Sequence, residues 1–136
     1  MASFSVKDGA PDNGPMFDGI PTYELKEENG KIFVNVPKVI KHKTPVKTHK
    51  RDHNNNEKFV IVGGGPAGLS AAETLRQSGF TGIIEIYSDE PNYSYDRTLL
   101  TKNIFGANYS GIKIRDDSYL NSLEICLLYT SPSPRD

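Results

Sequence analysis

A glycine-rich turn between an apolar run and a run of small residues constrains this chain more than any other feature. Residues 59–62 read Phe-Val-Ile-Val, as in a buried strand. Gly63, Gly65 and Gly68 follow at the spacing G-x-G-x-x-G, and a pattern typical of a helix begins at Pro66. Strand, tight turn and helix in this order predict the start of a βαβ unit.

Glycine is required at each of these three positions for a different physical reason. Gly63 permits a tight turn, Gly65 lets the backbone approach a pyrophosphate, and Gly68 lets the helix lie close to the strand. The free backbone N–H groups and the dipole at such a helix start favour a diphosphate. We therefore predict that these glycines, with Pro66 and Ala67, bind a dinucleotide cofactor. A plain turn without a ligand is the alternative.

A second strand is predicted at residues 83–87, after a helix over residues 66–78 that Gly79 would cap. Strand, helix and strand of these lengths predict a parallel, right-handed βαβ unit. The predicted fold class is therefore α/β, as a partial Rossmann-like domain.

An acidic residue about 20 positions beyond the glycines bonds the adenosine ribose in many such units. Ser88 stands where this acid is usual, so we expect Asp89 first and Glu90 second to take the role. An ordinary acidic turn is the alternative. Two adjacent carboxylates also disfavour a cofactor that carries a 2′-phosphate here.

Length and charge narrow the class of protein. The 136 residues fit one domain with an appendage, and a net charge of −1 gives no reason to expect a nucleic acid partner. A single cysteine, Cys126, excludes an internal disulfide framework and a multi-cysteine zinc site. The sequence has no apolar stretch of about 20 residues and no signal-peptide pattern. We expect an intracellular protein, cytoplasmic or mitochondrial and not secreted, without a membrane span.

Two further segments precede the βαβ unit. Residues 1–37 are rich in turn residues and contain a hairpin signal, in which Asn29-Gly30 separates two alternating runs. A hairpin alone is marginal in water, so we interpret this segment as the edge of a larger β domain. Residues 38–57 are polar and basic, and we interpret them as a solvated linker. Anion binding by the linker is the alternative, and no metal site is predicted.

Residues 58–102 resemble the FAD-binding start of the pyridine nucleotide-disulphide oxidoreductase family, and within it the apoptosis-inducing-factor-like branch. The stretch Tyr-Asp-Arg-Thr-Leu-Leu-Thr-Lys at residues 95–102 is similar to that family's Arg-x-x-Leu-Ser/Thr-Lys element. The resemblance implies that Arg97 and Lys102 contact FAD. It also implies that residues 58–125 are the N-terminal part of an FAD/NAD(P)-binding domain.

Residues 3–36 resemble the C-terminal edge of a Rieske [2Fe–2S] domain, which precedes the flavoprotein in one group of this branch. The resemblance makes residues 1–37 a remnant of a Rieske-like domain. Two Cys and two His ligands are needed for such a cluster, and this segment supplies neither pair. Residues 126–136 resemble translated library-adapter sequence, and we exclude them from the fold prediction.

Together these features predict a fragment of an FAD-dependent NAD(P)H oxidoreductase, a flavoprotein that passes electrons to or from an iron–sulfur centre. The expected partner is a redox protein or a fused iron–sulfur domain. Two alternatives stay open: a fragment of an NAD-binding dehydrogenase, and a non-enzymatic adaptor or nucleotide-binding fragment. No catalytic residue is assigned, and the isolated chain is expected to be inactive.

Overall fold

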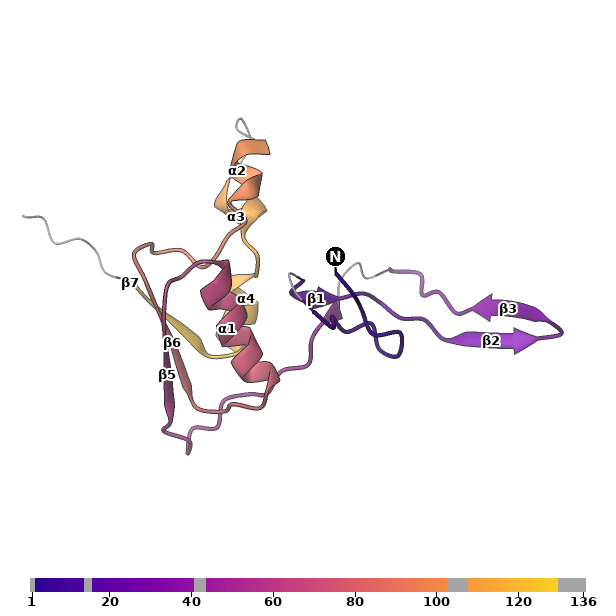
Figure 1. Ribbon diagram of the computed structural model, residues 1–136, viewed down its shortest axis with the longest axis horizontal. Coiled ribbons are helices and arrows are strands. Elements are labelled where there is room, and N and C mark those ends of the chain that lie inside the picture. The colour runs from indigo at the N-terminus through magenta and orange to yellow at the C-terminus, as the bar shows by residue number, and fades with distance from the viewer. Residues whose placement is uncertain (1, 14–15, 41–43, 103–107, 130–136) are drawn as a thin grey trace, which may run out of the picture. The chain divides into compact units, whose positions relative to one another are not determined.

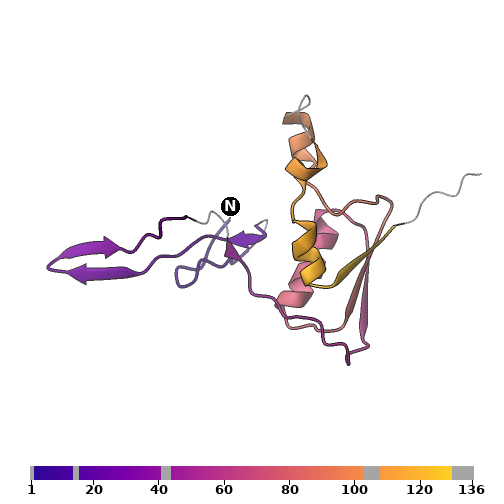
Figure 2. The same cartoon turned by 180° about the vertical axis from the view of Figure 1, so that it is seen from behind.

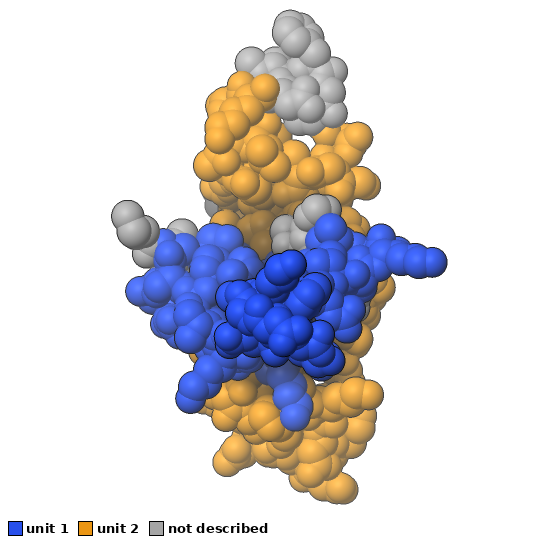
Figure 3. All heavy atoms as spheres, turned by 90° about the vertical axis from the view of Figure 1, so that its right-hand side faces the viewer, with its two compact units in different colours: residues 1–47 blue, residues 48–136 orange. Residues whose placement is uncertain are grey.

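The computed structural model describes residues 2–13, 16–40, 44–102 and 108–129. The chain divides into two compact units, Met1–Lys47 and Thr48–Asp136, which are coloured separately in Figure 3. Within the described residues, no helix is both long enough and apolar enough to cross a membrane.

The first unit contains two short antiparallel sheets. Strand β1 (Asp18–Gly19) pairs with β4 (Thr44–Pro45), and strand β2 (Leu25–Glu28) pairs with β3 (Lys31–Val34). The turn between β2 and β3 holds Asn29 at φ 53° and Gly30 at φ 71°. Both central residues thus have positive φ, as a two-residue type I′ turn requires. The predicted hairpin is confirmed, with its turn at the predicted dipeptide (Figure 1).

The β2–β3 hairpin leaves its apolar side chains in solvent. The register places Leu25 opposite Val34, with Ile32 two positions before Val34 on the same face. Leu25 and Ile32 are 69% and 70% exposed. Such a hairpin gains little from burial, so it is of marginal stability by itself. Its assignment to the edge of a larger β domain stays a prediction.

The second unit is a parallel sheet with helical crossovers (Figure 1). Strand β5 (Lys58–Val62) is followed by helix α1 (Pro66–Gln77) and strand β6 (Ile83–Ser88). Strand β7 (Ile125–Tyr129) completes the order β5-β6-β7, and both strand pairs are parallel. The predicted α/β class and the parallel βαβ unit are confirmed. The helix ends one residue before its predicted end, with Gly79 at φ 95° just beyond the cap.

The second crossover, from β6 to β7, contains three short helices. These are α2 (Thr98–Lys102), α3 (Tyr109–Ile112) and α4 (Asp117–Ser122). Residues 94–96 and 112–114 lie alongside each other, because the Asp96 N–H donates to the Ile112 carbonyl at 2.8 Å. Helix α4 ends three residues before the third strand of the sheet begins at Ile125.

One face of the sheet carries the core. Figures 1 and 2 show α1 and α4 on the same side of the sheet. Helix α1 buries Leu69 and Ala72 there, and β6 buries Ile84 and Ile86. The alternate residues of the strands point to the opposite face, where Val62 is 88% exposed. The sheet is therefore covered by helices on one face.

Arg76 ties the end of α1 to the starts of two strands. Its side chain is fully buried. The guanidinium donates to the carbonyl oxygens of Leu123 at 2.9 Å, Phe80 at 2.9 Å and Gly82 at 2.8 Å. Burial lowers the pKa of Arg76. The planar fork of five donors suits this task, because it satisfies several converging carbonyls at once.

Residues 48–57 belong to the second unit, which differs from the predicted solvated linker over residues 38–57. The His49 N–H donates to the Arg76 carbonyl, and the Asp52 N–H donates to the Thr81 carbonyl, each at 2.9 Å. Side chains of the segment add contacts, with Arg51 donating to Glu124 at 3.4 Å and Asn55 donating to the Thr81 hydroxyl at 3.2 Å. Residues 48–57 are thus hydrogen-bonded within the second unit, and the linker assigned to residues 38–57 stays a prediction.

Strand β7 extends through Tyr129, four residues into the segment excluded as an adapter-derived tail. Cys126 pairs with Glu85 in the register, and Leu127 pairs with Ile86. The apolar composition of residues 126–129 suits a strand, whatever the origin of that segment. Residues 130–136 lie outside the described residues.

Candidate dinucleotide-binding site

The glycine turn packs tightly against its neighbours. Gly63 has φ 116°, a conformation that favours glycine, and its N–H donates to the Tyr87 carbonyl at 2.8 Å. A β-carbon added at Gly68 would lie 1.9 Å from the Gly63 carbonyl oxygen. One added at Gly64 would lie 2.4 Å from the Ser88 Oγ, a constraint that the spacing G-x-G-x-x-G does not reveal. The turn therefore brings α1 close to the ends of β5 and β6.

Gly65 stands at the opening of the site. It is the residue before the first turn of α1, with φ −75° and ψ −176°, and Pro66 occupies the first helical position. A β-carbon added at Gly65 would meet no described atom within 4 Å. Among the described side chains none caps the helix, and the first turn holds no acidic residue. The first N–H groups of a helix lack intrahelical partners, so they are available here to an anion.

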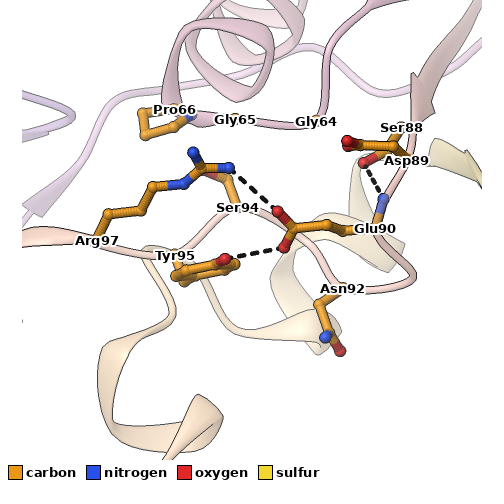
Figure 4. Close-up of a pocket in the computed structure, with 10 residues that line it drawn as sticks. All are labelled: Gly64, Gly65, Pro66, Ser88, Asp89, Glu90, Asn92, Ser94, Tyr95 and Arg97. Carbon is orange, nitrogen blue, oxygen red and sulfur yellow. Dashed lines mark hydrogen bonds and ion pairs between the residues drawn. The ribbon is translucent and has the colours of Figure 1, made fainter. Parts of the chain in front are cut away.

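A pocket lies between this helix start and the segment that follows β6 (Figure 4). The space between its walls measures about 270 Å³ and is partly open to solvent. Five of the predicted cofactor-binding residues line it. The full lining is Gly64, Gly65, Pro66, Ser88, Asp89, Glu90, Asn92, Ser94, Tyr95 and Arg97.

The carboxylate of Glu90 is the centre of the polar contacts in this pocket. It accepts hydrogen bonds from the Tyr95 hydroxyl at 2.9 Å and from the Arg97 guanidinium at 3.1 Å (Figure 4). The hydrogen bond to Glu90 raises the pKa of Tyr95. The guanidinium also lies 5.8 Å from the centre of the Tyr95 ring. Glu90 and Arg97, predicted from separate motifs, therefore lie together.

The other predicted residues stand differently. Asp89 is exposed and lines the pocket beside Glu90. Lys102 is exposed at the end of α2 and is not among the pocket-lining residues. Its positive charge contributes to the lowered pKa of Asp96, whose main cause is the hydrogen bond from the Thr98 hydroxyl at 2.7 Å. The structure thus brings Arg97, but not Lys102, to this pocket.

Sequence reasoning missed a buried ion pair behind the site. Glu73 on α1 accepts two hydrogen bonds from Arg115, from Nε at 2.7 Å and from Nη2 at 2.9 Å. The two residues are 42 positions apart, so no local pattern in the sequence connects them. Tyr95 could have been identified from the sequence, because it is the first residue of the 95–102 stretch that contains Arg97.

A metal centre would need a cluster of ligand side chains, and the described part of the chain contains none. There, no group of three His, Cys, Asp or Glu side chains is placed to hold a metal ion. The single cysteine, Cys126, is free and exposed on β7.

Residues 57–124, half of the chain, match the pyridine nucleotide-disulphide oxidoreductase family. Relatives include apoptosis-inducing factor 3 of Mus musculus, which is 30% identical over 76% of this chain and 18% of its own length. A ferredoxin–NAD(P)(+) reductase from a Sphingomonas species is 40% identical over 50% of this chain and 17% of its own length. Rhodocoxin reductase of Rhodococcus erythropolis is 35% identical over 57% of this chain and 18% of its own length.

No solved structure matches the chain. The chain spans less than a fifth of the length of the curated relatives that it matches. The family match covers the glycine turn, the pocket and the Arg97 segment together. The chain therefore belongs to the pyridine nucleotide-disulphide oxidoreductase family.

Proposed function

We propose that this chain binds the adenosine diphosphate portion of FAD, in an oxidoreductase that moves electrons between NAD(P)H and an iron–sulfur partner. The observation that carries the proposal is the uncapped start of α1, where Gly65 faces open space beside a pocket. Backbone N–H groups and the helix dipole there suit a diphosphate. Membership of the family supports FAD as the dinucleotide.

The residues of the pocket fit this cofactor in part. The backbone N–H groups of Gly65, Ala67 and Gly68 would hold the diphosphate, and Arg97 would add a charged donor to phosphate oxygens. Asp89 would hold the ribose, since Glu90 is engaged by Tyr95 and Arg97. If Arg97 turned toward a phosphate, the Glu90 Oε1 that now accepts from it could accept from a ribose hydroxyl, while Oε2 kept its hydrogen bond from Tyr95. FAD itself, when bound, supplies the hydride and single-electron chemistry.

Lys102 and the iron–sulfur partner belong to the same proposal. Lys102 would approach the flavin end of the cofactor, outside the pocket described here. The partner is an iron–sulfur protein or domain. The names of two relatives, a ferredoxin–NAD(P)(+) reductase and rhodocoxin reductase, support this part of the proposal. The match to apoptosis-inducing factor 3 is longer than the stretch from Lys58 to Asp136, so it includes residues of the N-terminal segment. The Rieske-like origin of residues 1–37 is part of this proposal.

The test is a binding titration of the purified chain with FAD, ADP, adenosine, NADH and NADPH, measured by calorimetry. FAD and ADP should bind, and the Arg97→Gln variant should weaken both by about tenfold or more, since hydrogen bonds to charged groups contribute about 1.5–3 kcal/mol. Lys50→Gln, at an exposed cation outside the pocket, is the matched control and should change nothing.

Each result has a defined reading. Binding of NADH in preference to FAD would favour the alternative, a nicotinamide-binding dehydrogenase. If neither FAD nor ADP bound to a folded chain, the proposed function would be wrong. Equal affinity for ADP and adenosine would also contradict it, because the diphosphate is the group that the helix start is proposed to hold.

A further inference from the structure

The buried ion pair between Glu73 and Arg115 has no contact with the pocket, yet it joins the two walls that form the pocket. Glu73 lies on α1, whose first turn forms one wall, and Arg115 lies between α3 and α4. Their side chains are 2% and 9% exposed. The guanidinium donates from two nitrogens to the two carboxylate oxygens, at 2.7 Å and 2.9 Å. The contact is therefore bidentate and fixes both the distance and the orientation of the two side chains.

From Arg115 the connection runs to the opposite wall through backbone hydrogen bonds. The Ile114 N–H, next to Arg115, donates to the Ser94 carbonyl at 3.2 Å. The Asp96 N–H donates to the Ile112 carbonyl at 2.8 Å, so two hydrogen bonds join residues 112–114 to residues 94–96 as an antiparallel bridge. Arg97 follows directly, and its guanidinium reaches Glu90 in the pocket.

A gain in folding stability alone does not explain why an ion pair, rather than an apolar pair, is buried at Glu73 and Arg115. Desolvation of two charges consumes most of their attraction, and a well-packed apolar pair of similar volume is often as stable. An apolar pair does not fix the relative orientation of its two side chains. The planar guanidinium of arginine does, because it donates two parallel hydrogen bonds to a carboxylate. Arg115 is also held from its other side, with its guanidinium 5.1 Å from the centre of the Tyr119 ring. These contacts are suited to fixing the position of α1 relative to the segment that contains Arg115.

We propose that the Glu73–Arg115 ion pair is a positioning device for the cofactor site. It fixes residues 94–97 against α1, and so sets the distance between Arg97 and the start of the helix, where the diphosphate is proposed to bind. The inference rests on the proposed function for the identity of the ligand. The geometric part of it stands without any ligand. Both are positioning residues, since neither lines the pocket.

The first experiment needs no cofactor. Arg115→Lys keeps the charge that compensates Glu73 but loses the two-nitrogen fork, so the variant should fold. Amide hydrogen exchange of Asp96 and Ile114 should become about fivefold faster or more, within the range of couplings between contacting residues. Exchange of Gly63, whose N–H bonds to β6, should stay unchanged. Unchanged exchange at Asp96 and Ile114 would overturn the inference.

Two further variants make the exchange result specific. Glu57→Gln removes an exposed carboxylate in the same unit and should leave all of these amides unchanged. Glu73→Gln should reproduce the faster exchange seen with Arg115→Lys. Uniformly faster exchange through the sheet would mean general destabilisation, and would contradict a positioning role.

The second experiment is a double-mutant cycle with FAD as the probe. Arg115→Lys should weaken FAD binding about fivefold when Arg97 is present, and should have no further effect in an Arg97→Gln background. Equal weakening in both backgrounds would show that the pair does not act through Arg97, and would refute the inference. Failure of the unsubstituted chain to bind FAD would instead refute the proposed function, while the exchange result still decides whether the pair positions residues 94–97.

Discussion

Gly68 and Gly65 lie three positions apart, and the structure predicts opposite consequences for an added methyl group. At Gly68 the β-carbon would lie 1.9 Å from the Gly63 carbonyl oxygen, whereas real contacts of this kind are not found under 3.0 Å. The helix would have to move away from the turn by at least about 1.1 Å, the difference between these values. At Gly65 the methyl group would meet no described atom within 4 Å.

The two free energies of unfolding follow from these contacts. Overpacking in a tight contact costs about 1–3 kcal/mol, and a backbone oxygen cannot rotate away, so the upper end applies at Gly68. Alanine regains about 1 kcal/mol of helix propensity, which leaves Gly68→Ala destabilised by about 2 kcal/mol. At Gly65 the backbone is already compatible with alanine. The gain of about 0.4–1 kcal/mol from the unfolded state then offsets a similar loss of capping preference.

The assay separates folding from binding. Urea unfolding followed by tyrosine fluorescence gives stability, since the chain has seven tyrosines and no tryptophan. Titration with FAD gives affinity. We expect Gly68→Ala to lose stability and Gly65→Ala to keep it, while Gly65→Ala loses FAD affinity because its methyl group occupies space proposed for the diphosphate. A Gly68→Ala variant as stable as the parent would refute the packing argument, and full FAD affinity in Gly65→Ala would refute the binding argument.

Three other changes test separate parts of the structure. Arg76→Met should lower the free energy of unfolding by about 3 kcal/mol or more in urea titrations, because hydrogen bonds to charged groups contribute about 1.5–3 kcal/mol each and several buried carbonyls lose their donor; Arg76→Lys should recover part of the loss. The pKa of Asp96 is lowered from 3.8 mainly by its hydrogen bonds from Thr98, so its contribution is present above that value and is lost as pH falls through the lower folded pKa. The Thr98 amide resonance should titrate in this acidic range in the parent chain and not in Asp96→Asn; a flat profile in the parent would contradict the contact. Gly30→Ala places a side chain at φ 71° at a cost of about 1 kcal/mol, and should reduce the cross-strand contacts of the β2–β3 hairpin seen by NMR; unchanged contacts would contradict the turn.

The sequence predicted the elements whose causes are local. The glycine turn, α1 and the two flanking strands follow from the spacing of apolar and small residues within about 30 positions. The hairpin follows from a single dipeptide, Asn29-Gly30, that tolerates positive φ. Glu90 and Arg97 were predicted from separate motifs, and their pairing was not predicted.

Contacts between distant positions could not be predicted in this way. Glu73 and Arg115 are charged residues on otherwise ordinary segments, and only the fold brings them together and buries them. Residues 48–57 have the composition of a polar linker, because the groups that their backbone and side chains contact, on Arg76, Thr81 and Glu124, lie far along the chain. The carbonyl groups that converge on Arg76 could not be predicted either, because backbone groups leave no pattern in the sequence.

The most direct test of the central claim is to add ADP, and separately adenosine, to the ¹⁵N-labelled chain and follow its amide resonances. We predict that ADP shifts the amides of Gly64, Gly65, Ala67 and Gly68, and that adenosine, which lacks the diphosphate, leaves them nearly unchanged. Absence of shifts at these four amides with ADP, or shifts confined to the basic residues 44–51, would contradict a diphosphate site at the start of α1.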